Sequence, residues 1–185
     1  MKRAILTLLL LASYSAITSC QAIESWEESK NEALRSVNSG DCATAWNIIW
    51  PWARDGKTEA RSLLATGIYS AGITPPGSKD AITLLRHTFI LSVHGSVNGD
   101  AATLELLHSL LNTELLADMG GKPLQRCLST NRQPGDCIAD AVNAGLVPDF
   151  QDYALEIDAL SKVLSPVSSC RTSGSASSES LPIKK

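Results

Sequence analysis

Apolar residues recur at helical spacing along most of this chain, in runs that begin at polar capping residues and end at glycine or proline. No segment alternates apolar and polar residues between hairpin turns, so the pattern predicts an all-α fold. The connections are short, which favours antiparallel neighbours. The runs predict helices near residues 26–37, 41–54, 60–71, 80–94, 100–119, 136–143 and 149–164.

Several positions refine these predictions. Asp41, Ser78 or Asp80, Asp100 and Asp149 are the expected N-caps. Pro51 removes a backbone donor inside the second helix, so a kink is expected there, or a helix that ends and restarts. The expected inward stripes of the fourth and fifth helices are Ile82, Leu85, Phe89 and Val93, and Leu104, Leu107, Leu111 and Leu115.

A weak internal repeat groups these helices. The segments 41–56 and 80–95 both open with aspartate and close with glycine, at an offset of 39 residues. Within 41–60, the residues Asp41, Ala45, Ile48, Trp52-Ala53, Gly56 and Ala60 resemble the second helix and following turn of a Sel-one-like repeat, a relative of the tetratricopeptide repeat. Tyr69 and Gly72 match the family's Tyr-x-x-Gly, one residue out of register. The resemblance covers roughly residues 23–117.

This resemblance implies a short right-handed α-solenoid of antiparallel helical hairpins, in which stacked hairpins bury their apolar stripes. So short an array needs caps, and the amphipathic C-terminal helix at 149–164 is the expected capping helix. The predicted domain spans residues 20–166, with the repeat-like part at 23–117 and the C-terminal helices at 136–164. The Ser-rich tail at 167–185 has no apolar period, so we expect it to be disordered.

The first 19 residues have the pattern of a signal peptide, because a basic start precedes an apolar run that is too short to cross a bilayer. The run ends in Ile17-Thr18-Ser19-Cys20, which resembles the bacterial lipobox. The resemblance implies lipidation of Cys20 and a periplasmic domain held at the membrane by lipid alone. Gln21 favours the outer membrane. Ordinary secretion with cleavage near Ala22 is the alternative.

The cysteine count agrees with export. Apart from Cys20, four cysteines remain, and an even number in an exported chain indicates two disulfides. Cys127 and Cys137 enclose a polar loop with turn residues, so we pair them, which leaves Cys42 with Cys170. A zinc site is the alternative, although no C-x-x-C spacing is present.

Charge and motifs exclude several function classes. The chain has 16 basic and 19 acidic residues, a net charge of −3, and loss of two leader cations gives 14 − 19 = −5. The chain has no basic stripe of the kind that binds nucleic acid.

The candidate ligands and acid–base pairs are also incomplete. His87, His94 and His108 lack the carboxylates that a metal site needs. Acidic pairs on the last helix, Asp152 with Glu156 and Glu156 with Asp158, are typical of a solvated face. We expect no enzyme, no metal and no cofactor.

The tryptophans offer a candidate interface. Trp46 and Trp50 form a patch beside the core stripe of the second helix, which includes Trp52. They either pack against the preceding helix with Trp26 or stay partly exposed as a hot spot for a partner.

The expected function is protein–protein interaction in the periplasm, as an adaptor, assembly factor or accessory lipoprotein that holds an extended partner segment. An inhibitor or immunity lipoprotein that neutralises a toxin or hydrolase is one alternative, and a stoichiometric complex that abolishes the enzyme's activity would identify it. A cell-wall-active enzyme is the other alternative, and hydrolysis of a peptidoglycan fragment would identify it.

Overall fold

The computed structural model describes residues 25–70, 72–78, 80–116 and 121–164, and their regular structure is entirely helical. This confirms the all-α prediction. None of the helices in these ranges has the length and hydrophobicity that a membrane span requires. In chain order they are α1 (Trp26–Asn38), α2 (Cys42–Arg54), α3 (Thr58–Tyr69), α4 (Ala81–Gly95), the 3-10 turn η1 (Ser96–Asn98), α5 (Ala101–Leu111), α6 (Glu114–Leu116), α7 (Lys122–Leu128), α8 (Pro134–Asn143) and α9 (Phe150–Val163).

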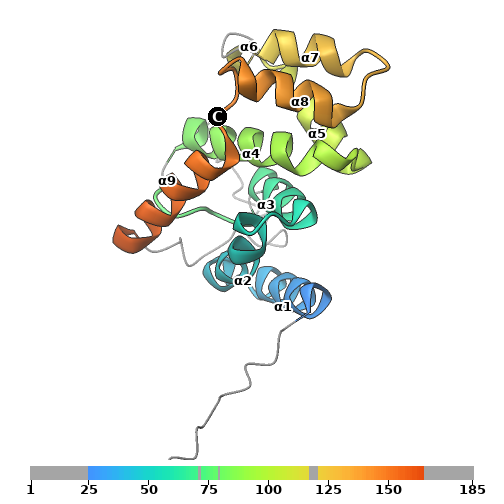
Figure 1. Cartoon of the computed structure of the whole chain (residues 1–185). Coiled ribbons are helices and arrows are strands. Elements are labelled where there is room, and N and C mark those ends of the chain that lie inside the picture. The colour runs from blue at the N-terminus through green and yellow to red at the C-terminus, as the bar shows by residue number, and fades with distance from the viewer. Residues whose placement is uncertain (1–24, 71, 79, 117–120, 165–185) are drawn as a thin grey trace, which may run out of the picture.

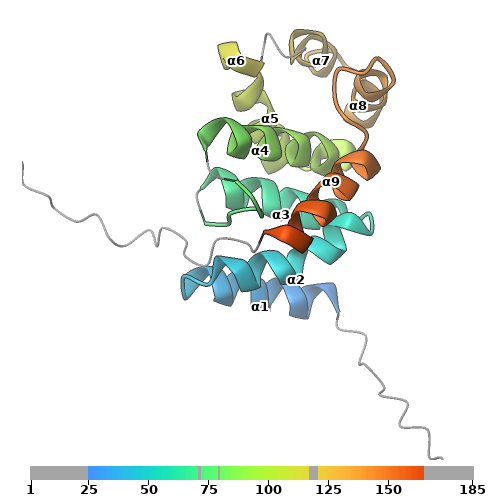
Figure 2. The same cartoon turned by 90° about the vertical axis from the view of Figure 1, so that its left-hand side faces the viewer.

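The first five helices form a row in which each helix packs on the next. Contacts join α1 to α2, α2 to α3, α3 to α4 and α4 to α5, and Figure 2 shows these helices layered in chain order. The short helices α7 and α8 pack on each other beyond α5, and α8 also contacts η1 (Figure 1). Within the row, α3 is packed between α2 and α4, and its other two sides are left to further elements or to solvent.

Local capping fixes where the helices begin. Asp41, Asp80 and Asp100 each accept a hydrogen bond from the backbone N–H three residues later. Asp149 caps α9 in the same manner, from the N–H two residues later. Gly40 follows α1 with a φ of 82°, a conformation that costs little only for glycine. The predicted aspartate caps are confirmed.

Pro51 does not interrupt α2, which is continuous from Cys42 to Arg54. The prediction of a helix that ends and restarts there is wrong. The Pro51 ring is exposed and lies near the end of the helix, so its missing N–H removes one helical bond and no more. Its carbonyl still accepts from the Asp55 N–H at 3.0 Å.

The buried faces of α4 and α5 match the predicted stripes in part, because Phe89, Val93, Leu107 and Leu111 are buried as predicted and Ile82 is not. Ile82 is 65% exposed, whereas every residue from His87 to Gly95 is buried. The second half of α4 is covered because α3, α5 and α9 all contact it. On α5 the buried leucines are Leu106, Leu107, Leu110 and Leu111.

The chain between α5 and α8 was also predicted incorrectly. The fifth helix ends at Leu111 and not near residue 119, and α6 follows it. Helix α7 was not predicted at all, because seven residues are too few to establish a helical period.

Helix α9 is amphipathic, as predicted, and buries Phe150, Tyr153, Ala154 and Ile157. It does not cover the end of the row, as a capping helix would. It runs back past α4 and α3 toward α2 (Figure 2), so it covers one side of the row.

Candidate interaction groove

Another side of the row is hollowed along α3. Three depressions, of about 490, 300 and 300 Å³, lie between α3 and its neighbours α1 and α5. Thr66 borders all three, Leu63 borders the first two, and Ala102 borders the first and third. The depressions therefore form one continuous surface, which we name the α3 groove.

The largest depression lies where α1, α3 and α5 begin. Trp26 forms its α1 edge and is held edge-on against Trp52, with ring centroids 5.8 Å apart. The Lys57 ammonium lies 6.0 Å from the Trp26 ring. Asn98 of η1 donates to the Thr58 hydroxyl at 3.0 Å, which ties the loop to the start of α3. This end of the groove combines one aromatic ring with hydrogen-bonding groups.

The base of this depression is formed where α3 and α4 approach each other closely, at Ser62 and Gly95. The Ser62 hydroxyl donates to the Gly95 carbonyl at 3.3 Å. A Cβ on Gly95 would lie 2.9 Å from the Ser62 backbone nitrogen, so only glycine fits there. Thr66 directs its hydroxyl back to the Ser62 carbonyl at 3.0 Å. Small side chains on α3 thus leave space that larger ones would fill.

The second depression lies between α1 and α3 and is apolar. Leu34 and Val37 line it from α1, Leu63 lines it from α3, and Ile73 lines it from the following loop. Gly67 makes room for Ile73, because a Cβ at Gly67 would lie 2.7 Å from the Ile73 Cδ1. Leu34 stays 39% exposed. A hollow of this composition suits an apolar side chain of a ligand.

The third depression lies between α3 and α5, beside an exposed aromatic ring. Tyr69 is 60% exposed at its edge, and Glu105 and Leu106 line it from α5. Tyrosine is enriched at protein interfaces because its ring buries apolar area while its hydroxyl keeps a hydrogen bond. Tyr69 and Leu34 are two of the five large apolar side chains that stay exposed in the described part of the chain.

Charges at the polar end of the groove are paired locally. Lys30 lies 3.7 Å from Glu27, and Glu59 lies 3.6 Å from Lys57. A hydrogen bond from its own backbone N–H lowers the pKa of Glu59, which keeps it ionised at neutral pH. The rim therefore presents both cationic and anionic side chains that can form hydrogen bonds.

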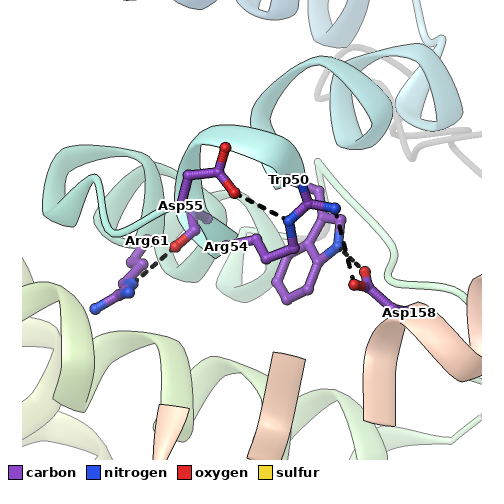
Figure 3. A network of polar contacts seen from close by, with 6 residues as sticks. Trp50, Arg54, Asp55, Arg61 and Asp158 are labelled. Carbon is purple, nitrogen blue, oxygen red and sulfur yellow. Dashed lines mark hydrogen bonds and ion pairs between the residues drawn. The ribbon is translucent and has the colours of Figure 1, made fainter. Parts of the chain in front are cut away.

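Helix α9 is bound to the row by a different set of contacts, and Figure 3 shows those that Trp50 and Arg54 make with Asp158. The Trp50 indole N–H donates to the Asp158 carboxylate at 2.8 Å, and the Arg54 guanidinium lies 3.8 Å from the other oxygen. The Arg61 guanidinium lies 3.6 Å from the centroid of the Phe150 ring and donates to a carbonyl of α2 at 2.9 Å. Side chains of α2 and α3 thus bind α9.

Of the two arrangements expected for Trp46 and Trp50, the exposed interface is wrong, because both rings are buried. They are 1% and 6% exposed and stack with centroids 5.1 Å apart. Trp50 also packs edge-on against Tyr153 of α9 at 6.1 Å. Trp52, and not this pair, contacts Trp26. Trp50 is covered by α9, a helix that the sequence pattern placed at the end of the array.

Two further contacts join α4 to α9. Arg86 donates two hydrogen bonds of 2.7 Å to Glu156, and this pairing lowers the pKa of that carboxyl group. Buried His87 shares a hydrogen bond of 3.0 Å between its Nδ1 and the Tyr153 hydroxyl. Burial lowers the pKa of His87 to about 4, so the ring is neutral at pH 7.

Four of the residues considered for chemistry, His87, His94, Glu156 and Asp158, have structural partners. His94 donates from Nε2 to the Pro148 carbonyl at 2.9 Å, while Glu156 and Asp158 bind Arg86 and Trp50. Within the described ranges, no three His, Cys, Asp or Glu side chains are grouped so that they could hold a metal.

Cys127 and Cys137 form a disulfide that links α7 to α8, as predicted, with Cα atoms 5.6 Å apart. The second predicted pair joins Cys42 to Cys170, and Cys170 lies outside the described residues. The signal peptide, the lipidation site Cys20 and the tail at 167–185 also lie outside them, so all of these stay predictions.

No family model, curated protein or solved structure matches this chain. A functional argument therefore has to start from the surface itself.

The α3 groove was not predicted from the sequence. Leu34 lies in the apolar run of the first predicted helix, and Tyr69 entered the sequence analysis only through the Tyr-x-x-Gly match. One signal could have indicated the groove: Ser62 and Thr66 lie one turn apart on α3, where a surface helix normally carries long side chains.

Proposed function

We propose that this chain is a protein-interaction module that binds an extended segment of a partner protein in the α3 groove. The continuity of the three depressions through Thr66 carries the proposal. An extended peptide fits a groove that offers pockets for some side chains and hydrogen-bonding groups for its backbone. The row of helices is compatible with a short Sel-one-like solenoid, in which such a face binds partners.

The composition of the groove favours binding over catalysis. Its described lining residues include hydroxyl, amide and carboxylate groups, but no histidine or cysteine. Exposed Tyr69, in the third depression, is the kind of side chain that anchors a peptide. Exposed Leu34 extends the apolar surface of the second depression. We expect the ligand to place an apolar residue between Leu34 and Leu63.

We place this module in the periplasm, held at the outer membrane by a lipid on Cys20. The lipobox-like tetrapeptide after an apolar leader supports this placement. Mass spectrometry of the membrane fraction should find acylated Cys20 at the N-terminus. A soluble protein that begins at Ile23 would refute the lipid anchor.

Site-specific photocrosslinking tests the groove. A photoreactive residue at position 34 or 69 should capture one partner from envelope membranes, whereas the same residue at Leu155, which is 68% exposed but outside the groove, should not. Equal capture of that partner from position 155 would refute the groove as its binding site.

Affinity measurements with the captured partner then distinguish a variant whose groove is blocked from a variant that is merely unfolded. Ala102 is exposed and borders two depressions, so Ala102→Trp should fill the groove and weaken binding at least tenfold. Ala139→Trp is the matched control, an exposed alanine on α8. Similar affinities for the two variants would contradict the proposal.

A further inference from the structure

Helix α9 connects the two helix pairs that form the apolar part of the α3 groove. Leu34 belongs to α1, which packs on α2, and Leu63 belongs to α3, which packs on α4. Asp158 of α9 binds α2 through Trp50, and its neighbour Glu156 binds α4 through Arg86. A helix that does not line the groove thus joins its two walls, in addition to the direct contact between α2 and α3.

Two of the three histidines lie beneath this helix. His87 and His94 are two turns apart on α4, and they are 1% and 6% exposed. His87 bonds the Tyr153 hydroxyl of α9, and His94 bonds the Pro148 carbonyl, two residues before α9 begins. The His94 ring also packs edge-on against Phe150 at 5.3 Å. Two of the polar contacts from α4 to α9 and the residues just before it thus pass through an imidazole, and the Arg86–Glu156 pair is a third.

Arginines face both imidazoles. Arg86 and Glu156 are the charged groups beside His87, and Tyr153 stays neutral because burial raises the pKa of its hydroxyl. Protonated His87 would carry its charge next to Arg86, and its Nε2 is buried without a hydrogen-bond partner in the described structure. A buried, unpaired N–H on a cation is strongly unfavourable.

His94 has a comparable environment from different elements. Arg61 of α3 faces it on one side, and Asp149, the cap of α9, faces it on the other. Burial lowers the pKa of His94 as well. When both rings are protonated, two new positive charges stand beside two arginines, against the carboxylates of Glu156 and Asp149.

We propose that α9 is a proton-released brace: protonation of His87 and His94 detaches α9 from α4 and loosens the α3 groove. Once α9 is released, both protonated rings are exposed to water, which solvates their charges. The row from α1 to α5 keeps its own packing, since its helices contact one another directly. The effect on the groove rests on the proposed function, whereas the release of α9 does not.

Hydrogen exchange on the mature chain tests the release. Between pH 7.5 and pH 5, after correction for intrinsic exchange rates, the amides of α9 should lose at least tenfold more protection than those of α2 and α3. Tryptophan fluorescence should change over the same pH range, because Trp50 packs against α9. Unchanged α9 protection at pH 5 would overturn the proposal.

Isosteric variants test the assignment to these histidines. His87→Asn and His94→Gln keep a hydrogen-bonding group near each bonded ring nitrogen but do not titrate, so the double variant should hold α9 at pH 5. His108→Gln on α5 is the control and should release α9 like the natural chain. Each single variant should shift the release to lower pH, which keeps the test valid if the double variant fails to fold. Release at the natural pH in both single variants would overturn the assignment.

The link to the groove needs no ligand. Genetically encoded spin labels at positions 34 and 69 should show a broader distance distribution at pH 5 than at pH 7.5, and this change should vanish in the double variant. An unchanged distribution despite α9 release would refute the link between brace and groove. A chain that releases α9 but binds no partner at pH 7.5 would instead refute the proposed function.

Discussion

Removal of the Cys127–Cys137 disulfide should destabilise one end of the molecule selectively. The bond joins α7, of seven residues, to α8, of ten. Helices of this length are marginal without tertiary contacts. The buried side chains here are few: in α7 only Leu124 is buried, and Ile138 and Ala141 accompany Cys137 in α8. The covalent link therefore replaces much of the packing that longer helices would supply.

The size of the effect follows from the loop that the bond closes. The two cysteines are 10 residues apart, and the chain-entropy relation for such a loop gives roughly 3 kcal/mol at 25 °C. The double variant Cys127→Ala/Cys137→Ala should lose about this much free energy of unfolding. The loss should be somewhat larger because Cys137 is 1% exposed, so its sulfur also fills core space.

Urea unfolding of the double variant measures this loss, with Asn131→Ala, an exposed position in the loop that the bond closes, as a near-neutral control. Hydrogen exchange should localise the effect to α7 and α8, while α3 and α4 keep their protection at neutral pH. A loss below about 1 kcal/mol, with α7 still protected, would show that packing and not the disulfide holds this end.

Three further predictions test the packing. Gly95→Ala should cost about 2 kcal/mol or more in urea unfolding, because a Cβ would meet the backbone of α3, whereas Gly99→Asn, with open space around it, should cost less than about 1 kcal/mol. Trp50→Phe removes the bond to Asp158 and should cost about 1 to 3 kcal/mol by the same assay, whereas Asp158→Asn keeps an acceptor and should cost less. The folded pKa of His87, about 4, lies below its ordinary value of 6.5, so the unfolded chain binds more protons between these values. Stability should therefore fall by roughly 3 kcal/mol as the pH drops from 6.5 to 4, and a urea series across this range measures it.

The helix starts could be predicted because their causes are local. Asp41 and Asp100 each bond the backbone three residues ahead, so the sequence alone contains both partners. The buried face of α4 could be predicted only in part: Phe89 and Val93 are buried as expected, but Ile82 is not. Ile82 fits the apolar period of its helix, yet it is exposed because the neighbouring helices cover only the second half of α4.

The position of α9 and the α3 groove depend on contacts between distant residues. Trp50 and Asp158 are 108 residues apart in the chain, and His87 and Tyr153 are 66 apart. A hydrophobic pattern identifies the buried face of α9 but not the helices that it packs against. The groove was missed for a related reason: it arises where Ser62 and Thr66 leave volume unfilled, and periodicity reports apolar positions but not volume.

The contacts of α9 and the exposed α3 groove have one cause, the small number of helices in the row. In a row of helices each element is stabilised mainly by the next one, so a short row gains little from its interior. Contacts from α9 to α2, α3 and α4 add long-range packing on one side of the row. That packing lets Leu34 and Tyr69 stay exposed beside α3 without being needed to hold the row together. A binding surface that contributes little to folding can accept substitutions that alter specificity, whereas substitutions in α9 should change stability and groove geometry together.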